Sequence, residues 1–181
     1  MSLVIALALV GAVQVAEPEG YWTGAMRGDV PWALAGARVI DDAALDRLIA
    51  DERPVLIDVS PEEPRPPGNR PWLPLHRSIP DSRWLPGAGE GVLAPSRVTL
   101  LTTIAVRNRA VVIFCHPRCW ASWNAAKRLV RAGHPRVFWY AAGIEGWQER
   151  HATAVVQPDS AWAASAAVSP AAPRASAGDR P

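Results

Sequence analysis

Three short apolar runs constrain the fold of this 181-residue chain more than any other feature. They are Pro54 to Val59 (PVLIDV), Ala110 to Phe114 (AVVIF) and Arg136 to Tyr140 (RVFWY). Continuous apolar runs of this length, rich in β-branched or aromatic residues, are typical of strands buried on both faces. The sequence therefore predicts a sheet that is covered by other elements on both sides.

Segments with apolar residues at helical spacing lie around these runs. We expect helices at Asp42 to Ile49, Ser96 to Arg107, Ser122 to Ala132 and Ile144 to Arg150. Asp41 or Asp42 is placed to cap the first helix, and Gly133 to end the third. Strands that alternate with helices predict an α/β fold, with a central, mainly parallel sheet flanked by helices.

Composition narrows the classes of function. Lys and Arg number 19 against 17 Asp and Glu, a net charge of +2, and no Lys/Arg cluster appears along the chain. A nucleic-acid partner is therefore not expected. The two cysteines are too few for a disulfide-dense scaffold, so the fold must depend on a hydrophobic core.

The apolar segment at the N-terminus has the length of the hydrophobic region of a secretory signal peptide. Leu3 to Val15 is apolar apart from Gln14, and as a helix it would rise only ~20 Å, too short to cross a ~30 Å hydrocarbon core. We expect residues 1–16 to be a signal peptide cleaved after Ala16, although no Lys or Arg precedes the apolar run. The alternative is a buried first strand or helix. Cleavage would leave an N-terminal extension at residues 17–37 and no lasting membrane span.

The C-terminus changes composition. From Val156 onward the chain consists mostly of Ala, Ser and Pro, with Trp162 as its one large side chain. Such a segment buries little apolar surface to offset the entropy of ordering, so residues 153–181 are predicted to be a disordered Ala/Pro/Ser tail. Proline-rich Pro61 to Pro74 predicts an irregular loop.

The strongest candidate for chemistry is Cys115, which ends the second strand just before a helix. Reacting groups in parallel sheets lie at the carboxyl ends of strands, and a helix N-terminus stabilises an anion. A free thiol there should have a lowered pKa, which Arg118 and a protonated His116 would lower further. Cys119 follows four positions later and could form a disulfide with Cys115, resolve an oxidised or persulfidated Cys115, or simply pack on the inner face of the helix.

The order of these motifs resembles a rhodanese-like domain over residues 38–152. The fold has a strand ending in Asp, a histidine-isoleucine-proline turn, a cysteine loop, and then a glycine-rich turn with Trp. The matching positions are Asp58, His76, Ile79, Pro80, Cys115, Gly143, Ile144, Gly146 and Trp147. The resemblance implies a sulfurtransferase with Cys115 as its catalytic residue, whereas His76 is expected to hold its turn and Asp58 its own strand end.

A narrower resemblance rests on CHPRCWASWNAAKR, on GYWTGAMRGDVP (Gly20 to Pro31) and on HRSIP. These motifs are similar to a rhodanese-like family named for a CXXCW motif and associated with pyrroloquinoline-quinone (PQQ)-dependent catabolism of alcohols. The spacing differs here, because three residues separate Cys115 from Cys119. The resemblance implies a periplasmic accessory protein whose partner is a quinoprotein dehydrogenase or its electron-transfer proteins. This chain itself is expected to bind no PQQ and no other cofactor.

The sequence departs from the pattern of active sulfurtransferases in three places. In the cysteine loop, Pro117 removes one backbone N–H donor and Trp120 stands where an arginine is expected. After the first strand, Ser60 stands where active members commonly carry Arg. His116, Arg118 and Trp120 are therefore candidates for an atypical anion-binding loop, and enzymatic activity stays open.

Two other functions remain open, and no metal site is expected because no spacing of Cys and His matches a zinc pattern. One is a non-catalytic periplasmic binding module with a structural Cys115–Cys119 disulfide, whose tryptophans fill a core or form an interface. The other is a thiol-redox or copper-handling protein.

Overall fold

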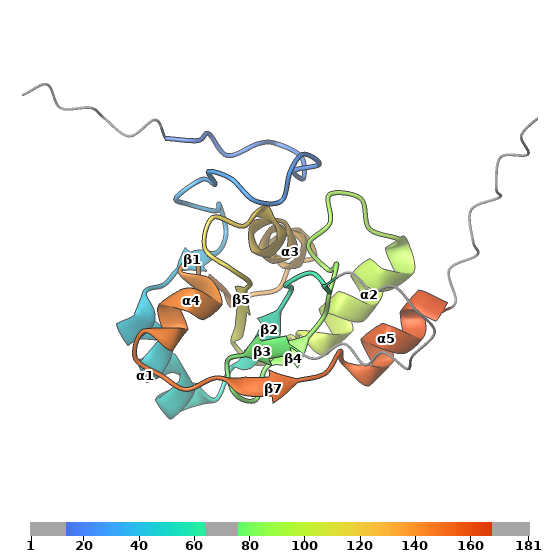
Figure 1. Ribbon diagram of the computed structural model, residues 1–181. Coiled ribbons are helices and arrows are strands. Elements are labelled where there is room, and N and C mark those ends of the chain that lie inside the picture. Colours follow the sequence, from blue (N-terminus) through green and yellow to red (C-terminus); the bar gives the residue numbers. More distant parts are fainter. Residues whose placement is uncertain (1–13, 64–75, 168–181) are drawn as a thin grey trace, which may run out of the picture.

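A five-stranded parallel sheet forms the centre of the computed structural model, which describes residues 14–63 and 76–167 (Figure 1). Every strand pair in this sheet is parallel. From one edge to the other the strands are β1 (Arg38–Val39), β6 (Val137–Trp139), β5 (Val111–Phe114), β2 (Val55–Asp58) and β4 (Arg83–Trp84). The three apolar runs thus contain the three inner strands, and every residue of these strands is buried.

Alternate residues of the inner strands face opposite layers of helices. Val111 and Ile113 belong to a core with α2 (Pro95–Ile104) and α3 (Trp120–Arg131). Val112 and Phe114 belong to a second core, with α1 (Asp42–Glu52) and α4 (Gly143–Gln148). Both faces of the sheet are therefore covered, which confirms the α/β prediction.

The predicted helices occur with small shifts at their ends. Asp41 caps α1, where its side chain accepts the Ala44 N–H at 2.8 Å. The helix after the cysteines, α3, begins at Trp120, two residues before the predicted start, and ends before Gly133, which has a φ of 74°. Trp120 therefore belongs to the first turn of a helix and not to the preceding loop.

The prediction of a disordered tail from residue 153 is wrong for residues 154–167. Strand β7 (Ala154–Val156) pairs antiparallel with β3 (His76–Ser78), and α5 (Ser160–Ala167) follows. Helix α5 lies beside α2 (Figure 1), and Trp162 is only 1% exposed. One large indole, together with strand pairing, orders a segment whose composition alone argues for disorder.

Several predictions fall wholly or partly outside the described residues. These include most of the signal peptide (residues 1–13), much of the proline-rich loop (64–75) and the end of the tail (168–181). Across the parts of the chain that the structure describes, no helix is both long enough and apolar enough to cross a membrane.

Candidate functional site

The cysteine loop connects the carboxyl end of β5 to the first turn of α3. Cys115 directly follows β5, and Cys119 occupies the N-cap position of α3. Between them Arg118 has a φ of 52°, and this left-handed backbone turns the chain into the helix. The loop thus lies where the sequence predicts it, at the carboxyl edge of the parallel sheet.

Cys115 and Cys119 are joined by a disulfide in the structure, with their Cα atoms 6.6 Å apart. Cys115 is fully buried and Cys119 is 3% exposed. A bonded sulfur does not titrate, so the lowered thiol pKa expected for Cys115 applies only to a reduced form. The structure therefore contains the disulfide alternative, with both sulfur atoms covered.

The glycine-rich turn packs directly against this loop. The Ile144 N–H donates to the Cys115 carbonyl at 2.8 Å. Gly143 has a φ of 64°, and a Cβ there would lie only 2.6 Å from the same carbonyl oxygen, so no other residue fits without displacing the loop. Glu145 lies on the same turn, and its carboxylate is 2.9 Å from His116 Nδ1. The turn therefore fixes both the backbone of Cys115 and the ring of His116.

Gly146 and Trp147 support that turn from the other side. A Cβ at Gly146 would lie 2.5 Å from the Ala142 Cβ. Trp147 donates its indole N–H to the Ala152 carbonyl at 3.0 Å and stacks on His151, with ring centroids 4.0 Å apart. Both residues are packing elements of α4 and neither contacts the cysteines in these interactions.

Asp58 is the centre of a buried polar cluster at the end of β2. Its carboxylate, fully buried, accepts the Ser60 N–H at 2.8 Å, His76 Nε2 at 2.8 Å and the Ser78 hydroxyl at 2.5 Å. The His76 ring lies 6.2 Å from the His116 ring, centroid to centroid. Asp58 and His76 thus hold each other beside the cysteine loop, and His76 belongs to β3, not only to a turn.

An N-terminal segment, residues 17–37, lies across α3 and the cysteine loop; we call it the strap (Figure 1). The Trp120 N–H donates to the Met26 carbonyl at 2.8 Å, and the Gly28 N–H donates to the Arg118 carbonyl at 3.0 Å. These bonds form a single antiparallel bridge that joins Arg27 to Cys119. The strap is therefore bonded to the loop at one of its two cysteines.

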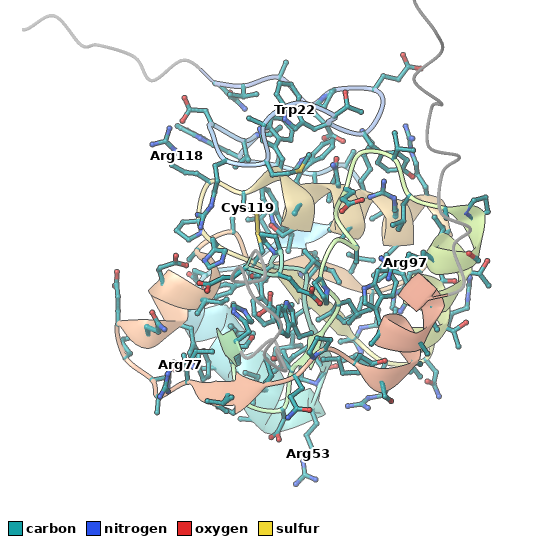
Figure 2. The ribbon with its side chains drawn as sticks, turned by 45° about the vertical axis from the view of Figure 1, so that its right-hand side comes forward. Trp22, Arg53, Arg77, Arg97, Arg118 and Cys119 are labelled. Atoms are coloured by element: carbon teal, nitrogen blue, oxygen red, sulfur yellow. A yellow bond between two sulfur atoms is a disulfide. The ribbon has the colours of Figure 1, made fainter. Side chains whose placement is uncertain are left out.

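Side chains of α3 hold the strap from below. Trp22 stacks on Trp120 with ring centroids 4.4 Å apart and planes tilted by 12°. Asn124, fully buried, accepts the Trp22 N–H at 2.8 Å and donates to the Trp22 carbonyl at 2.9 Å. In Figure 2, Trp22 lies in the strap above the cysteine disulfide, with Cys119 beneath it.

Cations on the same helix are buried under the strap. The Arg128 guanidinium lies 4.2 Å from the Tyr21 ring, and it donates to the carbonyls of Glu90 and Gly91. Burial lowers the pKa of Arg128, while Tyr21 and Glu90 act in the opposite direction. Lys127 lies 3.6 Å from Glu17 and contacts the Trp123 ring. The strap therefore covers what would otherwise be the polar face of α3.

The groups predicted to bind an anion are directed elsewhere in this structure. Pro117 has no N–H, and the Trp120 N–H bonds to the strap. Arg118 is exposed and pairs with Asp29 of the strap at 2.7 Å, while His116 pairs with Glu145. Anion binding by His116, Arg118 and Trp120 stays a prediction, and it would need these contacts to rearrange.

The contacts between the strap and α3 are not predictable from motifs. Trp22 and Met26 of the strap and Asn124 of α3 carry no recognisable motif for chemistry, although Trp22 and Met26 lie within the Gly20 to Pro31 stretch of the narrower resemblance. The available signal was the polar stripe of α3, where Asn124, Lys127 and Arg128 are all buried. When the apolar face of a helix packs on the sheet and its polar face is buried as well, another segment of the chain must cover the polar face.

One groove borders the loop without reaching the sulfur atoms. It has a volume of about 770 Å³ and lies between the strap, the loop and the turn after β6, with Val30, Trp32, Pro117 and Ala141 among its walls. Within the described residues, no group of three or more His, Cys, Asp or Glu side chains could hold a metal ion.

The family model for the rhodanese-like domain matches residues 41–150, which include β2, the cysteine loop, α3 and the glycine-rich turn. No curated protein matches the chain.

Proposed function

The chain belongs to the rhodanese-like domain family, and from this premise we propose that it is an exported accessory protein of a PQQ-dependent alcohol oxidation system. In this proposal it works by docking onto a periplasmic quinoprotein dehydrogenase or its electron-transfer proteins. The Cys115–Cys119 pair holds the loop in shape as a disulfide and does not carry sulfur between substrates.

The buried disulfide is the observation that carries this proposal. Sulfur transfer requires a free Cys115 thiolate that an anionic donor can reach and backbone N–H groups that stabilise the bound sulfur. Here Cys115 is bonded to Cys119 and fully buried, and the Trp120 N–H is bonded to Met26. A shared fold does not transfer the activity of the family to a loop so arranged.

The association with PQQ-dependent oxidation is supported by where its motifs lie. The three motifs that resemble the CXXCW family are far apart in sequence but adjacent in the structure. Trp22 of the first stacks on Trp120 of the second, and His76 of the third lies beside His116. Export is supported by the disulfide, because such bonds persist in oxidising compartments such as the periplasm.

A cyanolysis assay tests whether sulfur transfer occurs. In that reaction thiosulfate passes its outer sulfur to the enzyme thiolate, sulfite leaves, and cyanide removes the sulfur as thiocyanate. We expect wild-type protein and Cys115→Ser to give the same background rate, both before and after treatment with dithiothreitol. Thiocyanate formed faster by the wild type than by Cys115→Ser would contradict the non-catalytic proposal.

Fractionation and deletion test the export and the partner. The chain should occur in the periplasmic fraction, beginning at residue 17, and its deletion should lower PQQ-dependent alcohol oxidation in intact cells. Normal oxidation in the deletion strain, under conditions where the protein is otherwise present, would contradict the accessory role.

Thiol-redox chemistry at the same pair is the second candidate. It is favoured by the position of Cys115, at the carboxyl end of β5 and just before α3, where a reduced sulfur would be stabilised as thiolate. In the reduced protein, Cys115 of the Cys119→Ser variant should then react with iodoacetamide well below pH 8. A reaction that follows an ordinary thiol pKa of about 8.5 would remove this candidate.

A further inference from the structure

Three hydrogen bonds, besides the Arg118–Asp29 ion pair, join the strap to the cysteine loop and to the first residue of α3. They are the Trp120 N–H to Met26 bond, the Gly28 N–H to Arg118 bond and the Arg27 guanidinium to the Pro117 carbonyl at 3.2 Å. All three act on residues 117–120, which are the end of the loop that the disulfide closes and the start of α3. The loop conformation that accepts these bonds is thus the one that the disulfide maintains.

The strap also covers the disulfide. Cys119 is 3% exposed although it stands at the first turn of a helix near the molecular surface, and Trp22 lies over that turn on the Trp120 ring (Figure 2). Trp22 itself is 36% exposed, so it is the outer layer at this point. Both cysteines are thus buried in the structure in which the strap is in place.

We propose that the strap is a gate over the Cys115–Cys119 disulfide, and that gate and disulfide are coupled. A dithiol reduces the bond only after residues 22–29 lift from the loop. Reduction in turn frees the loop and loosens the strap. This inference rests on the disulfide of the proposed function and adds what controls access to it.

The reduction step is ordinary thiol–disulfide exchange. A thiolate of the dithiol attacks one sulfur of the pair, a mixed disulfide forms, and the other cysteine leaves as a thiolate. The second thiol of the reductant then attacks the mixed disulfide and releases the remaining protein cysteine as a thiolate. The protein gains two electrons and two protons, and the dithiol is oxidised to its own disulfide.

The coupling must act in both directions, because a linkage between two equilibria is reciprocal. If the lifted strap makes the disulfide easier to reduce at equilibrium, loss of the disulfide must favour the lifted strap. The amides that report on this are those of Gly28 and Trp120, which bridge strap and loop. Amides of β5 lie in the core and report on global unfolding instead.

The first test measures the rate of reduction by dithiothreitol, with alkylation and mass analysis of quenched samples. Trp22→Ala removes the stacking on Trp120 and should raise the rate about threefold to tenfold, the effect expected for loss of one stacked aromatic pair. Trp32→Ala is the matched control: Trp32 belongs to the same strap but is 66% exposed, and its variant should be reduced at the wild-type rate.

The second test measures hydrogen exchange in the oxidised wild type and in the Cys115→Ser/Cys119→Ser double variant. Exchange at Gly28 and Trp120 should be faster in the double variant, with β5 amides still protected in both. Equal reduction rates in Trp22→Ala and wild type would overturn the gate. Unchanged exchange at Gly28 and Trp120 would also overturn it. So would exchange of the β5 amides at the rate of disulfide reduction, because reduction would then proceed through global unfolding and not through lifting of the strap. If isolated protein instead carries two free thiols, it is the proposed function that fails.

Discussion

The two ends of the described chain both fold back onto the domain, but they are attached in different ways. The C-terminal segment, residues 154–167, is anchored by the fully packed Trp162 and by pairing of β7 with β3. The strap places one residue, Leu34, in the same core. Over the cysteine loop, however, it is held by backbone hydrogen bonds, by the partly exposed Trp22 and by charges on α3. The C-terminal segment is therefore attached through a buried indole and strand pairing, whereas the part of the strap over the loop is attached at the surface.

Trp162→Ala should have the largest effect on stability. Its indole is buried against α2, donates to the Pro86 carbonyl at 2.8 Å and lies under Arg97. Loss of a buried Trp lowers the free energy of unfolding by about 3–5 kcal/mol, measurable by urea denaturation. Trp32→Ala, at an exposed Trp, should change it by less than about 0.5 kcal/mol. Equal effects would mean that the C-terminal segment is not part of the core.

Asn124→Ala should destabilise the protein less, by about 1–3 kcal/mol, because it leaves the Trp22 backbone groups and the Gly89 carbonyl without their buried partner. Limited proteolysis should then cut within the strap before it cuts the core. Asn108→Ala is the control, since Asn108 is exposed. Intact straps in Asn124→Ala would contradict the role assigned to this side chain.

Asp159→Asn tests an ion pair of the C-terminal segment. Asp159 accepts from Arg83 at 2.6 and 2.8 Å and also from the Trp162 N–H at 3.1 Å. Asn keeps the helix-capping acceptor and removes the charge, so unfolding free energy should fall by about 1 kcal/mol. High salt should lower the unfolding free energy of the wild type towards that of the variant. A wild-type unfolding free energy that does not change with salt would argue against the ion pair.

Asp29→Asn should have the smallest effect. Asp29 and Arg118 are 73% and 70% exposed at the side chain, and exposed pairs contribute only about 0–1 kcal/mol. We expect a change below about 0.5 kcal/mol by urea denaturation. A loss larger than that of Asp159→Asn would reverse the comparison, and would mean that charge, not stacking on Trp120, holds the strap.

The sequence predicts the centre of this molecule well and its ends poorly. The apolar composition of inner strands such as Val111–Phe114 is enough to predict that they are buried, and Cys115 can be identified because it follows such a strand. Strands β1 and β4 span two residues each, too few to show a period. Composition misled at the C-terminus, because it counts Ala and Ser but does not register how much surface Trp162 buries.

The site was only partly predictable for a similar reason. Asp58, His76, Cys115 and Gly143 occupy positions that the motifs specify, and the structure brings them to one edge of the sheet. The covering of that edge depends on contacts across about a hundred positions, such as Trp22 with Asn124. Local patterns carry no information on contacts so distant in sequence.

The oxidation state of the two cysteines tests the central claim most directly. Protein isolated from cells without reductant is unfolded in guanidinium chloride, treated with iodoacetamide and analysed by mass spectrometry after digestion. The disulfide in the structure predicts no alkylated cysteine, and an intramolecular link between Cys115 and Cys119. Alkylation of both cysteines would contradict it, because the pair would then be free thiols beneath the strap.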